Sequence, residues 1–280
     1  MTKNINQLSL QIRKDAISSI YHARSGHPGG VLSCIDILTT LFHKIMSPAN
    51  LRNKSYSDDY FILSKGHAVP ALYAVAASIG LLERSELKTL RKLNSKLQGH
   101  PDVIHLPWVE VSTGSLGQGL SVATGIAKAL KLQNTNQRVY SIVGDGEMQE
   151  GQVWEAAMFA SHHKLNNLTV IADYNKLQSD ATNAEICALE PLSEKWRAFG
   201  WQVIEIDGHN HDEIFHALTP KTNITTPTII IAHTTKGKGV DFMENSPLWH
   251  GSVTLSEEQF FSAMKALGCN DKDIKEYTNV

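Results

Sequence analysis

Two short polar stretches, thirty residues apart, offer the clearest chemistry in this sequence. The first, Gly144-Asp145-Gly146-Glu147, follows an apolar run at 138–143, and the second ends at Asn175, just after an apolar run at 168–172. Carboxylate and amide oxygens are hard ligands that suit Mg²⁺ or Ca²⁺, and Mg²⁺ usually completes its coordination with phosphate oxygens and water. The glycines beside Asp145 let backbone and phosphate approach closely. The two stretches therefore predict a divalent metal and diphosphate site.

Both stretches stand at the end of a predicted β-strand. The apolar runs are short and rich in β-branched residues, and residues 153–165 between them have helical periodicity. A strand, a helix and a second strand in this order form a right-handed βαβ unit with parallel strands. Ligands of open parallel sheets bind beyond the carboxyl ends of the strands, so we expect Asp145 and Asn175 to lie together there.

The rest of the chain alternates in the same way. We expect further strands at 60–63, 202–206 and 228–232, and further helices at 8–24, 34–45, 68–79, 85–92, 119–132, 191–199, 211–218 and 256–267. The Gly- and Pro-rich segment 25–30 is predicted to be a loop, 98–113 to be irregular and the tail 270–280 to fray. This alternation predicts an α/β fold with a parallel sheet covered by helices on both faces.

Composition limits the classes of protein and partner. The 280 residues, 42% of them apolar, are enough for one α/β core, so we expect a single domain over 1–280. The net charge of −2, without a long basic or acidic run, favours neither nucleic acid nor a membrane surface as partner. The three cysteines, Cys34, Cys187 and Cys269, lie far apart in the sequence, which fits a reducing cytosol better than a disulfide framework. No apolar run suggests a signal peptide or a membrane span. A cytoplasmic location is expected.

The segment from Gly114 to Gly119 has the glycine spacing of a phosphate loop at a helix amino terminus. No clear strand precedes it, no acidic residue follows at the Rossmann distance, and no Gly-Lys-Ser/Thr follows, so a nucleotide site receives little support. A glycine-rich helix start needed for close packing is the alternative interpretation.

Four of the thirteen histidines stand apart because they lie in Gly- or Pro-rich loops: His27, His67, His100 and His250. The remaining nine are expected to be structural or surface residues. Lys236 and Lys238 could form a solvated basic turn, but the position of Lys236 after a predicted strand favours it as a phosphate ligand.

The segment 144–178 resembles the thiamine diphosphate fingerprint, and its sequence is similar to that of the transketolases in particular. The motifs SGHPGG at 25–30, SKGH at 64–67 and TGSLGQG at 113–119 resemble transketolase motifs as well. The resemblance covers nearly all of the chain and matches the amino-terminal half of a typical family enzyme. It implies a thiamine diphosphate-binding (PP-type) domain, without the family's pyrimidine-binding and carboxyl-terminal domains.

The resemblance also assigns site residues. It implies that Mg²⁺, for which Ca²⁺ or Mn²⁺ can substitute, is held by Asp145, Asn175 and the carbonyl of Leu177. The residues expected to bind the cofactor are Lys65, His67, Gly114, Ser115, Leu116, Gly146, Glu147, Asn175, Lys236 and His250. The residues expected to be catalytic are His27 and His100 in the sugar channel, His250 over the cofactor, and Glu150 and Glu155, which link two active sites across a dimer interface.

The implied reaction moves a two-carbon ketol unit from a ketose phosphate to an aldose phosphate. The family's proton relay needs a glutamate on the pyrimidine-binding domain, so the resemblance implies one subunit of a split transketolase, of the A type, in a heterotetramer with a carboxyl-terminal partner chain. Two alternatives remain: the α subunit of a 2-oxo acid dehydrogenase first component, which lacks SGHPGG and SKGH, and a non-catalytic thiamine diphosphate-binding module.

Because of two departures from the family pattern, the sequence does not determine which sugar is the substrate. Ser179 stands near the cofactor where many relatives carry an apolar residue, and the segment 103–111 has no counterpart that we can place. Pentose phosphates, apulose 4-phosphate and sulfosugars are all candidate substrates.

Overall fold

A computed structural model describes residues 4–46 and 59–278. Its centre is one sheet of five parallel strands in the order β1-β2-β3-β5-β4. The strands are β1 (Tyr60–Leu63), β2 (Val139–Gly144), β3 (Leu168–Tyr174), β4 (Gln202–Asp207) and β5 (Thr228–His233). All five predicted strands and their parallel arrangement are confirmed. The register places Asp173 of β3 opposite both Gly144 of β2 and Ala232 of β5, so three carboxyl ends are level.

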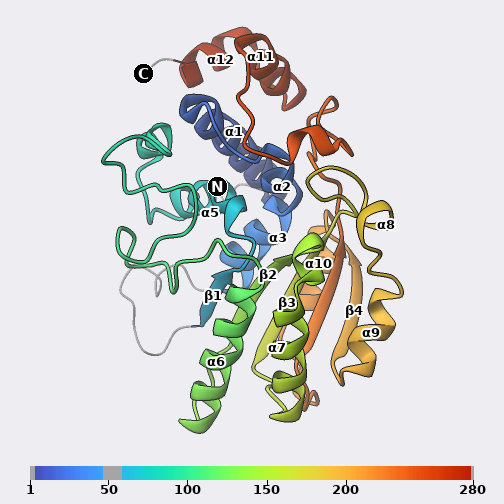
Figure 1. The fold of residues 1–280 in the computed structure, drawn as a ribbon. Helices are drawn as coiled ribbons and strands as arrows, with labels where there is room; N and C mark the ends of the chain where they lie inside the picture. Colours follow the sequence, from blue (N-terminus) through green and yellow to red (C-terminus); the bar gives the residue numbers. More distant parts are fainter. Residues whose placement is uncertain (1–3, 47–58, 279–280) are drawn as a thin grey trace.

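Helices cover both faces of this sheet, as the alternation predicts. One face packs against α6 (Gln118–Leu132), α7 (Gly151–His162) and α9 (Leu192–Ala198), and in Figure 1 the green helices α6 and α7 lie in front of the sheet. The other face packs against a layer made of α1 (Ile5–Ala23), α2 (Pro28–Ser33), α3 (Ile35–Thr40), α5 (Val69–Ser78) and α10 (His211–Leu218). Successive strand residues alternate between the two cores: Val170 belongs to the first and Ile171 to the second.

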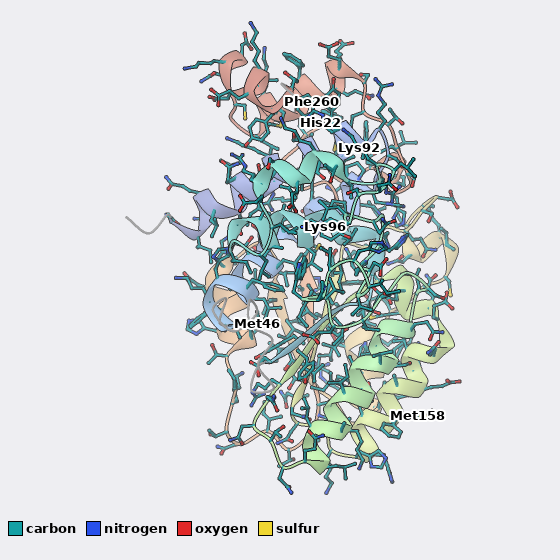
Figure 2. The ribbon with its side chains drawn as sticks, turned by 90° about the vertical axis from the view of Figure 1, so that its left-hand side faces the viewer. His22, Met46, Lys92, Lys96, Met158 and Phe260 are labelled. Carbon is teal, nitrogen blue, oxygen red and sulfur yellow. The ribbon has the colours of Figure 1, made fainter. Side chains whose placement is uncertain are left out.

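The prediction that the tail 270–280 frays is wrong for residues 271–278, which form a helix, while 279–280 lie outside the described residues. Helix α11 (Glu257–Ala266) is followed by α12 (Asp271–Thr278), and both lie against α1 at the top of Figure 1. Phe260 stacks on Tyr21 with ring centroids 4.1 Å apart, and Figure 2 shows it close to His22. Ile274 is buried, and the carbonyl of Tyr277 bonds to His22 Nε2 at 2.8 Å. Packing against α1 therefore stabilises α12, although the sequence of α12 is mostly polar.

Four predicted boundaries also need correction. Segment 25–30 is a loop only as far as His27, because Pro28 begins α2 and its fixed φ suits the first helical position. The helix expected at 34–45 is divided into α3 and a π-helical turn at Leu41–Ile45. The helix expected at 85–92 is a 3₁₀ helix at Arg84–Thr89, and α7 begins at Gly151, two residues before its predicted start.

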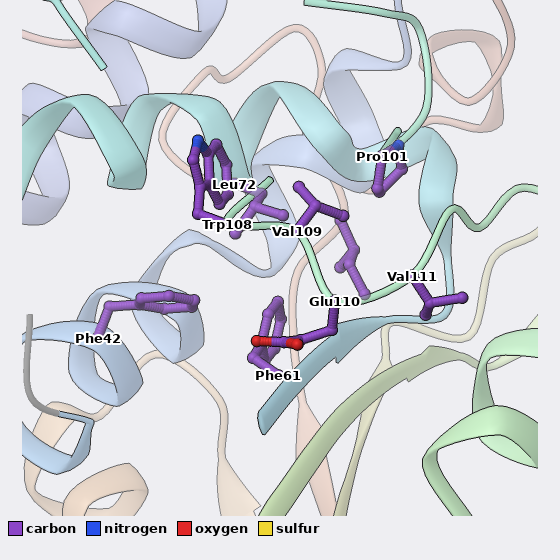
Figure 3. A pocket seen from close by; sticks show the side chains of 9 residues that line it. Phe42, Phe61, Leu72, Pro101, Trp108, Val109, Glu110 and Val111 are labelled. Atoms are coloured by element: carbon purple, nitrogen blue, oxygen red, sulfur yellow. The ribbon is translucent and has the colours of Figure 1, made fainter. Parts of the chain in front are cut away.

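The segment 98–113 is irregular, as predicted, but it is packed. Figure 3 shows Trp108 against Leu72 of α5 and Glu110 close to Phe61 of β1, around a small cavity of about 20 Å³. Val109 is buried in the same core. The remaining short helices are η2 (Gly66–Ala68), η4 (Gly146–Gln149), α8 (Asn183–Ile186) and η5 (Pro247–Trp249). Within 4–46 and 59–278, we find no helix with the length and apolar character to span a membrane.

Candidate functional site

A cleft of about 410 Å³ opens at the carboxyl ends of the strands, where the sequence predicts the site. It collects residues from both ends of the described chain, since loops after β1, β2, β3 and β5 all reach it. The predicted site residues that line it are His27, Lys65, His67, Gly114, Leu116, Asp145, Gly146, Glu147, Glu150, Asn175, Leu177, Lys236 and His250.

The three predicted metal ligands lie in neighbouring turns on the floor of this cleft. Asp145 is 3% exposed, with Oδ1 accepting from Gly146 N at 2.9 Å and Oδ2 accepting from Lys176 N at 2.5 Å. The side-chain oxygen of Asn175 accepts from Leu177 N at 3.1 Å. These bonds orient Asp145 from both sides and tie the turn after β2 to the turn after β3.

A lysine already places positive charge at this floor. Lys236 Nζ donates to the carbonyl of Leu177 at 3.0 Å and contacts His250 Nδ1. Burial, reinforced by the charge of Asp173, raises the pKa of Asp145 to about 6. Burial lowers the pKa of Lys236, against the opposing effect of Asp145. At Asp145, burial and the charge of Asp173 therefore outweigh the favourable charge of Lys236.

The donor set fits Mg²⁺ bound together with a diphosphate. It offers one carboxylate, one amide oxygen and one backbone carbonyl, which are too few ligands to fill an octahedron without phosphate oxygens and water. Consistent with this, the described parts of the chain contain no cluster of three or more His, Cys, Asp and Glu that could hold a metal by itself. Lys236 places a positive charge beside the Leu177 carbonyl, and His27 Nδ1 is a buried polar atom without a hydrogen-bond partner in the described structure.

Three of the predicted histidines form one cluster at the cleft. The ring centroids of His27 and His67 are 5.2 Å apart, and those of His67 and His250 are 5.5 Å apart. Burial is the main cause that lowers the pKa of His27 to about 4, that of His250 to about 3 and that of His67 well below its ordinary value. All three imidazoles are therefore neutral at neutral pH, so each can donate one hydrogen bond and accept another.

Glu147 has a structural position in the cleft wall. Its Oε1 accepts from Ser64 Oγ at 2.5 Å and from Gly117 N at 2.8 Å, while its Oε2 accepts from Gly144 N at 3.0 Å. This buried carboxylate joins the end of β1, the glycine-rich loop and the end of β2. Close packing shapes the same loop, because a Cβ at Gly119 would lie 2.6 Å from Ser64 Cα.

Lys65 is expected to approach a diphosphate, and its ammonium is already paired. Its Nζ donates to Asp173 Oδ2 and to the carbonyl of Gly30 at 2.9 Å, and both charged side chains are almost completely buried. Burial opposes the charge on Lys65, but the Asp173 carboxylate outweighs it and raises the Lys65 pKa. Ser33 Oγ at 2.5 Å and Thr234 Oγ1 also donate to Asp173. This network fixes α2, β1, β3 and β5 to one another beneath the cleft.

Three predicted residues are not among those that line the cleft. His100 lies beside it, since a Cβ at Gly114 would be 3.2 Å from His100 Cδ2. Ser115 is exposed on the glycine-rich loop, and Glu155 is exposed on α7. A role of Glu150 and Glu155 across a subunit interface remains a prediction.

The structure adds residues that the sequence argument did not select. Gly30, Gln149, Gln178 and Gly251 line the cleft, and Gln149 Nε2 donates to Gln178 Oε1 at 2.6 Å. Ser179, which is expected near the cofactor, lines the cleft as well. Asp173 could have been found, because it directly precedes Tyr174 and Asn175 at a strand end. Among the histidines expected to be structural, His209 bonds to Asp36 through Nδ1 and accepts from Thr235 N through Nε2, both at 2.8 Å, and it is not among the residues that line the cleft.

Comparison with known proteins agrees with this arrangement. Residues 5–278 match the family model of the transketolase thiamine diphosphate binding domain. The A-type subunit of the apulose-4-phosphate transketolase of Phocaeicola vulgatus is 42% identical over 248 residues, which cover 88% of each chain. The 6-deoxy-6-sulfo-D-fructose transketolase subunit SqwG of a Clostridium species is also 42% identical, over 91% of this chain and 93% of its own.

Longer relatives match over part of their length. Human transketolase is 42% identical over 243 residues, which cover 86% of this chain and 38% of the human protein. The solved transketolase of Leishmania mexicana superposes with a TM-score of 0.89 at 28% identity, over 99% of this chain and 44% of its own. The chain thus spans less than half of these enzymes but nearly all of the split subunits. Its sequence, fold and cleft place this chain in the transketolase family, as a thiamine diphosphate binding domain.

Proposed function

We propose that this chain is the cofactor-binding subunit of a two-chain transketolase, which uses Mg²⁺ and thiamine diphosphate to move a two-carbon ketol unit from a ketose phosphate to an aldose acceptor. The supporting observation is the cleft at the strand ends, which brings together Asp145, Asn175, Leu177 and Lys236. The named relatives of similar length are subunits of transketolases, which supports the two-chain form.

Different residues of the chain would bind the metal, the phosphates and the sugar. Asp145, Asn175 and the carbonyl of Leu177 would hold the metal, and Lys236 would offset phosphate charge. When bound, thiamine diphosphate supplies the reactive carbon and the electron sink for ketol transfer, while the protein supplies orientation and electrostatics. The neutral imidazoles of His27 and His100 would donate hydrogen bonds to sugar oxygens, and His250 would cover the cofactor.

A partner chain would supply the pyrimidine-binding and carboxyl-terminal domains, and the assembly would be a cytoplasmic heterotetramer built around the family's dimer. The sugar remains open in this proposal. The two similar subunits carry the names of different sugars, apulose-4-phosphate and 6-deoxy-6-sulfo-D-fructose, at the same identity of 42%. Sequence identity therefore does not indicate which of the two sugars this chain would use. The match to a transketolase model favours this function over that of a 2-oxo acid dehydrogenase subunit.

The test is co-expression of the chain with the product of a neighbouring transketolase gene, followed by a ketol-transfer assay on a panel of sugar phosphates. The proposal predicts transfer by the complex that depends on both chains, on Mg²⁺ and on thiamine diphosphate. Transfer by this chain alone would contradict the two-chain form. No transfer with any donor, from a complex that binds the cofactor, would contradict the activity.

A further inference from the structure

Arg91 contacts two loops that carry predicted site histidines. Its Nη1 donates to Ser25 Oγ at 2.7 Å and lies 3.3 Å from Ser252 Oγ. Ser25 is two residues before His27, and Ser252 is two residues after His250. One guanidinium nitrogen therefore joins the entry of the first loop to the exit of the second.

The same guanidinium packs against a third loop. A Cβ at Gly99 would lie 2.8 Å from Arg91 Nε, closer than Cβ atoms approach in proteins, and 3.1 Å from its Cζ. Gly99 directly precedes His100, so the missing side chain makes room for the guanidinium beside this histidine. Arg91 Nε is itself buried and has no hydrogen-bond partner among the residues that the structure describes.

The backbone holds Arg91 in an uncommon conformation at this junction. Its φ is 58°, in the left-handed region that residues other than glycine seldom adopt, and its N–H donates to the carbonyl of Leu97 at 2.8 Å. The loops of His27 and His250 are also joined directly, by a bond of 2.9 Å from Val253 N to the carbonyl of Gly26. Arg91 adds the loop of His100 to this pair.

The charge of Arg91 acts on the same histidines. After burial, Arg91 is the next largest cause that lowers the pKa of both His27 and His100. His100 and Lys236 are the other charged or titratable groups that lower the pKa of His27, and the rings of His67 and His250 also face it. The positive charge beside these imidazoles favours their neutral forms, which offer both a donor and an acceptor.

We propose that Arg91 is a positioning residue that holds His27 and His100 in the geometry needed to bind the sugar. The proposal rests on the proposed function for the identity of the ligand, but not for the contacts. Arg91→Gln removes the charge and part of the guanidinium fork, whereas Arg91→Lys keeps the charge. Lys92→Gln is the matched control, since it removes the same charge one residue later, from an exposed side chain that lies near His22 (Figure 2).

The first experiment needs no activity. In NMR spectra of the full chain without cofactor, Arg91→Gln should shift the imidazole signals of His27 and His100 and raise their pKa values. The signals of His43 should stay unchanged, and Lys92→Gln should leave His27 and His100 unchanged. Unaltered His27 and His100 signals in a folded Arg91→Gln chain would overturn the proposal.

The second experiment uses the two-chain complex. Arg91→Gln should raise the sugar KM by about 10-fold or more, because a hydrogen bond to a charged group and the alignment that it secures are lost. Affinity for thiamine diphosphate with Mg²⁺ should stay within about twofold, and Arg91→Lys should restore part of the KM. Equal losses of sugar and cofactor binding would mean general damage and would overturn the proposal. If the wild-type complex transfers no ketol unit, the proposed function fails, and the NMR comparison still decides the role of Arg91.

Discussion

The ammonium of Lys236 donates a hydrogen bond of 3.0 Å to the carbonyl oxygen of Leu177, so a cation from the end of β5 lies on an oxygen from the turn after β3. The resemblance to the transketolases implies that this oxygen binds a metal and that this lysine binds phosphates. Their contact shows that both groups lie at one point of the cleft. It also gives Lys236 a position from which a diphosphate on the cleft floor is within reach.

Loss of this charge should weaken cofactor binding. Lys236→Met should raise the Kd for thiamine diphosphate with Mg²⁺ by about 10- to 100-fold, since a hydrogen bond to a charged group is removed. Isothermal titration calorimetry measures the change. Lys238→Met is the control, because the Lys238 side chain is 40% exposed and only two residues away. The same loss in both variants, or no loss in Lys236→Met, would contradict the assignment.

Asp145 should titrate near pH 6 in the chain without metal, because burial raises its pKa. The amide of Lys176 donates to Asp145 Oδ2, so its ¹⁵N–¹H signal should report the titration. Above the midpoint the carboxylate is ionised, and Mg²⁺ with thiamine diphosphate should lower the midpoint because a cation favours the ionised form. Asp145→Asn should remove the transition. A midpoint near 4 before any metal is added is the result that argues against this environment.

The pair of Lys65 and Asp173 should be essential for stability. Asp173→Leu leaves a buried ammonium without its partner, so the free energy of unfolding should fall by about 3–5 kcal/mol. Denaturant unfolding of Asp173→Leu, Lys65→Met and the double variant forms a cycle. The double variant should lose clearly less than the sum of the two single losses. Additive losses would show that the two charges do not depend on each other.

Two glycines of α6 should respond to alanine in opposite directions. A Cβ at Gly119 would lie 2.6 Å from Ser64 Cα, whereas a Cβ at Gly125 would meet nothing within 4 Å. Gly119→Ala should destabilise the chain by about 1–3 kcal/mol through overpacking. Gly125→Ala should stabilise it by about 0.5–1 kcal/mol, because alanine suits a helix interior better than glycine. Thermal unfolding of both variants tests this, and a stable Gly119→Ala chain would refute the close approach.

The sequence predicts the sheet, and the meeting of Asp145 and Asn175 at one edge of it, because short-range patterns determine the strands and their ends. Runs of β-branched residues predict the strands β2 and β3, and the polar residues that follow show where each strand ends. Parallel strands bring these ends to one edge of the sheet. The pairing of Lys65 with Asp173 has no such signal, because it depends on the order in which β1, β2 and β3 join. The sequence does not predict the helix α12 for a similar reason, since Ile274 is buried in a core cluster that includes residues of the distant helix α1.

The position of His100, which is expected to bind the sugar, is less predictable than the cleft at the strand ends. His100 is placed by Gly99, Gly114 and Arg91, which come from separate segments of the chain. Arg91 resembles an ordinary surface arginine in the sequence, and only the folded loops show its contacts with Ser25 and Ser252. Long irregular segments position side chains through tertiary contacts that a periodic pattern does not record.

Anomalous diffraction from crystals of the chain grown with Mn²⁺ and thiamine diphosphate tests the central assignment most directly. We predict one manganese peak within about 2.5 Å of the Asp145 carboxylate, the Asn175 side-chain oxygen and the Leu177 carbonyl, with diphosphate oxygens completing its coordination. A manganese ion bound elsewhere, with these three oxygens turned away from it, would contradict the account.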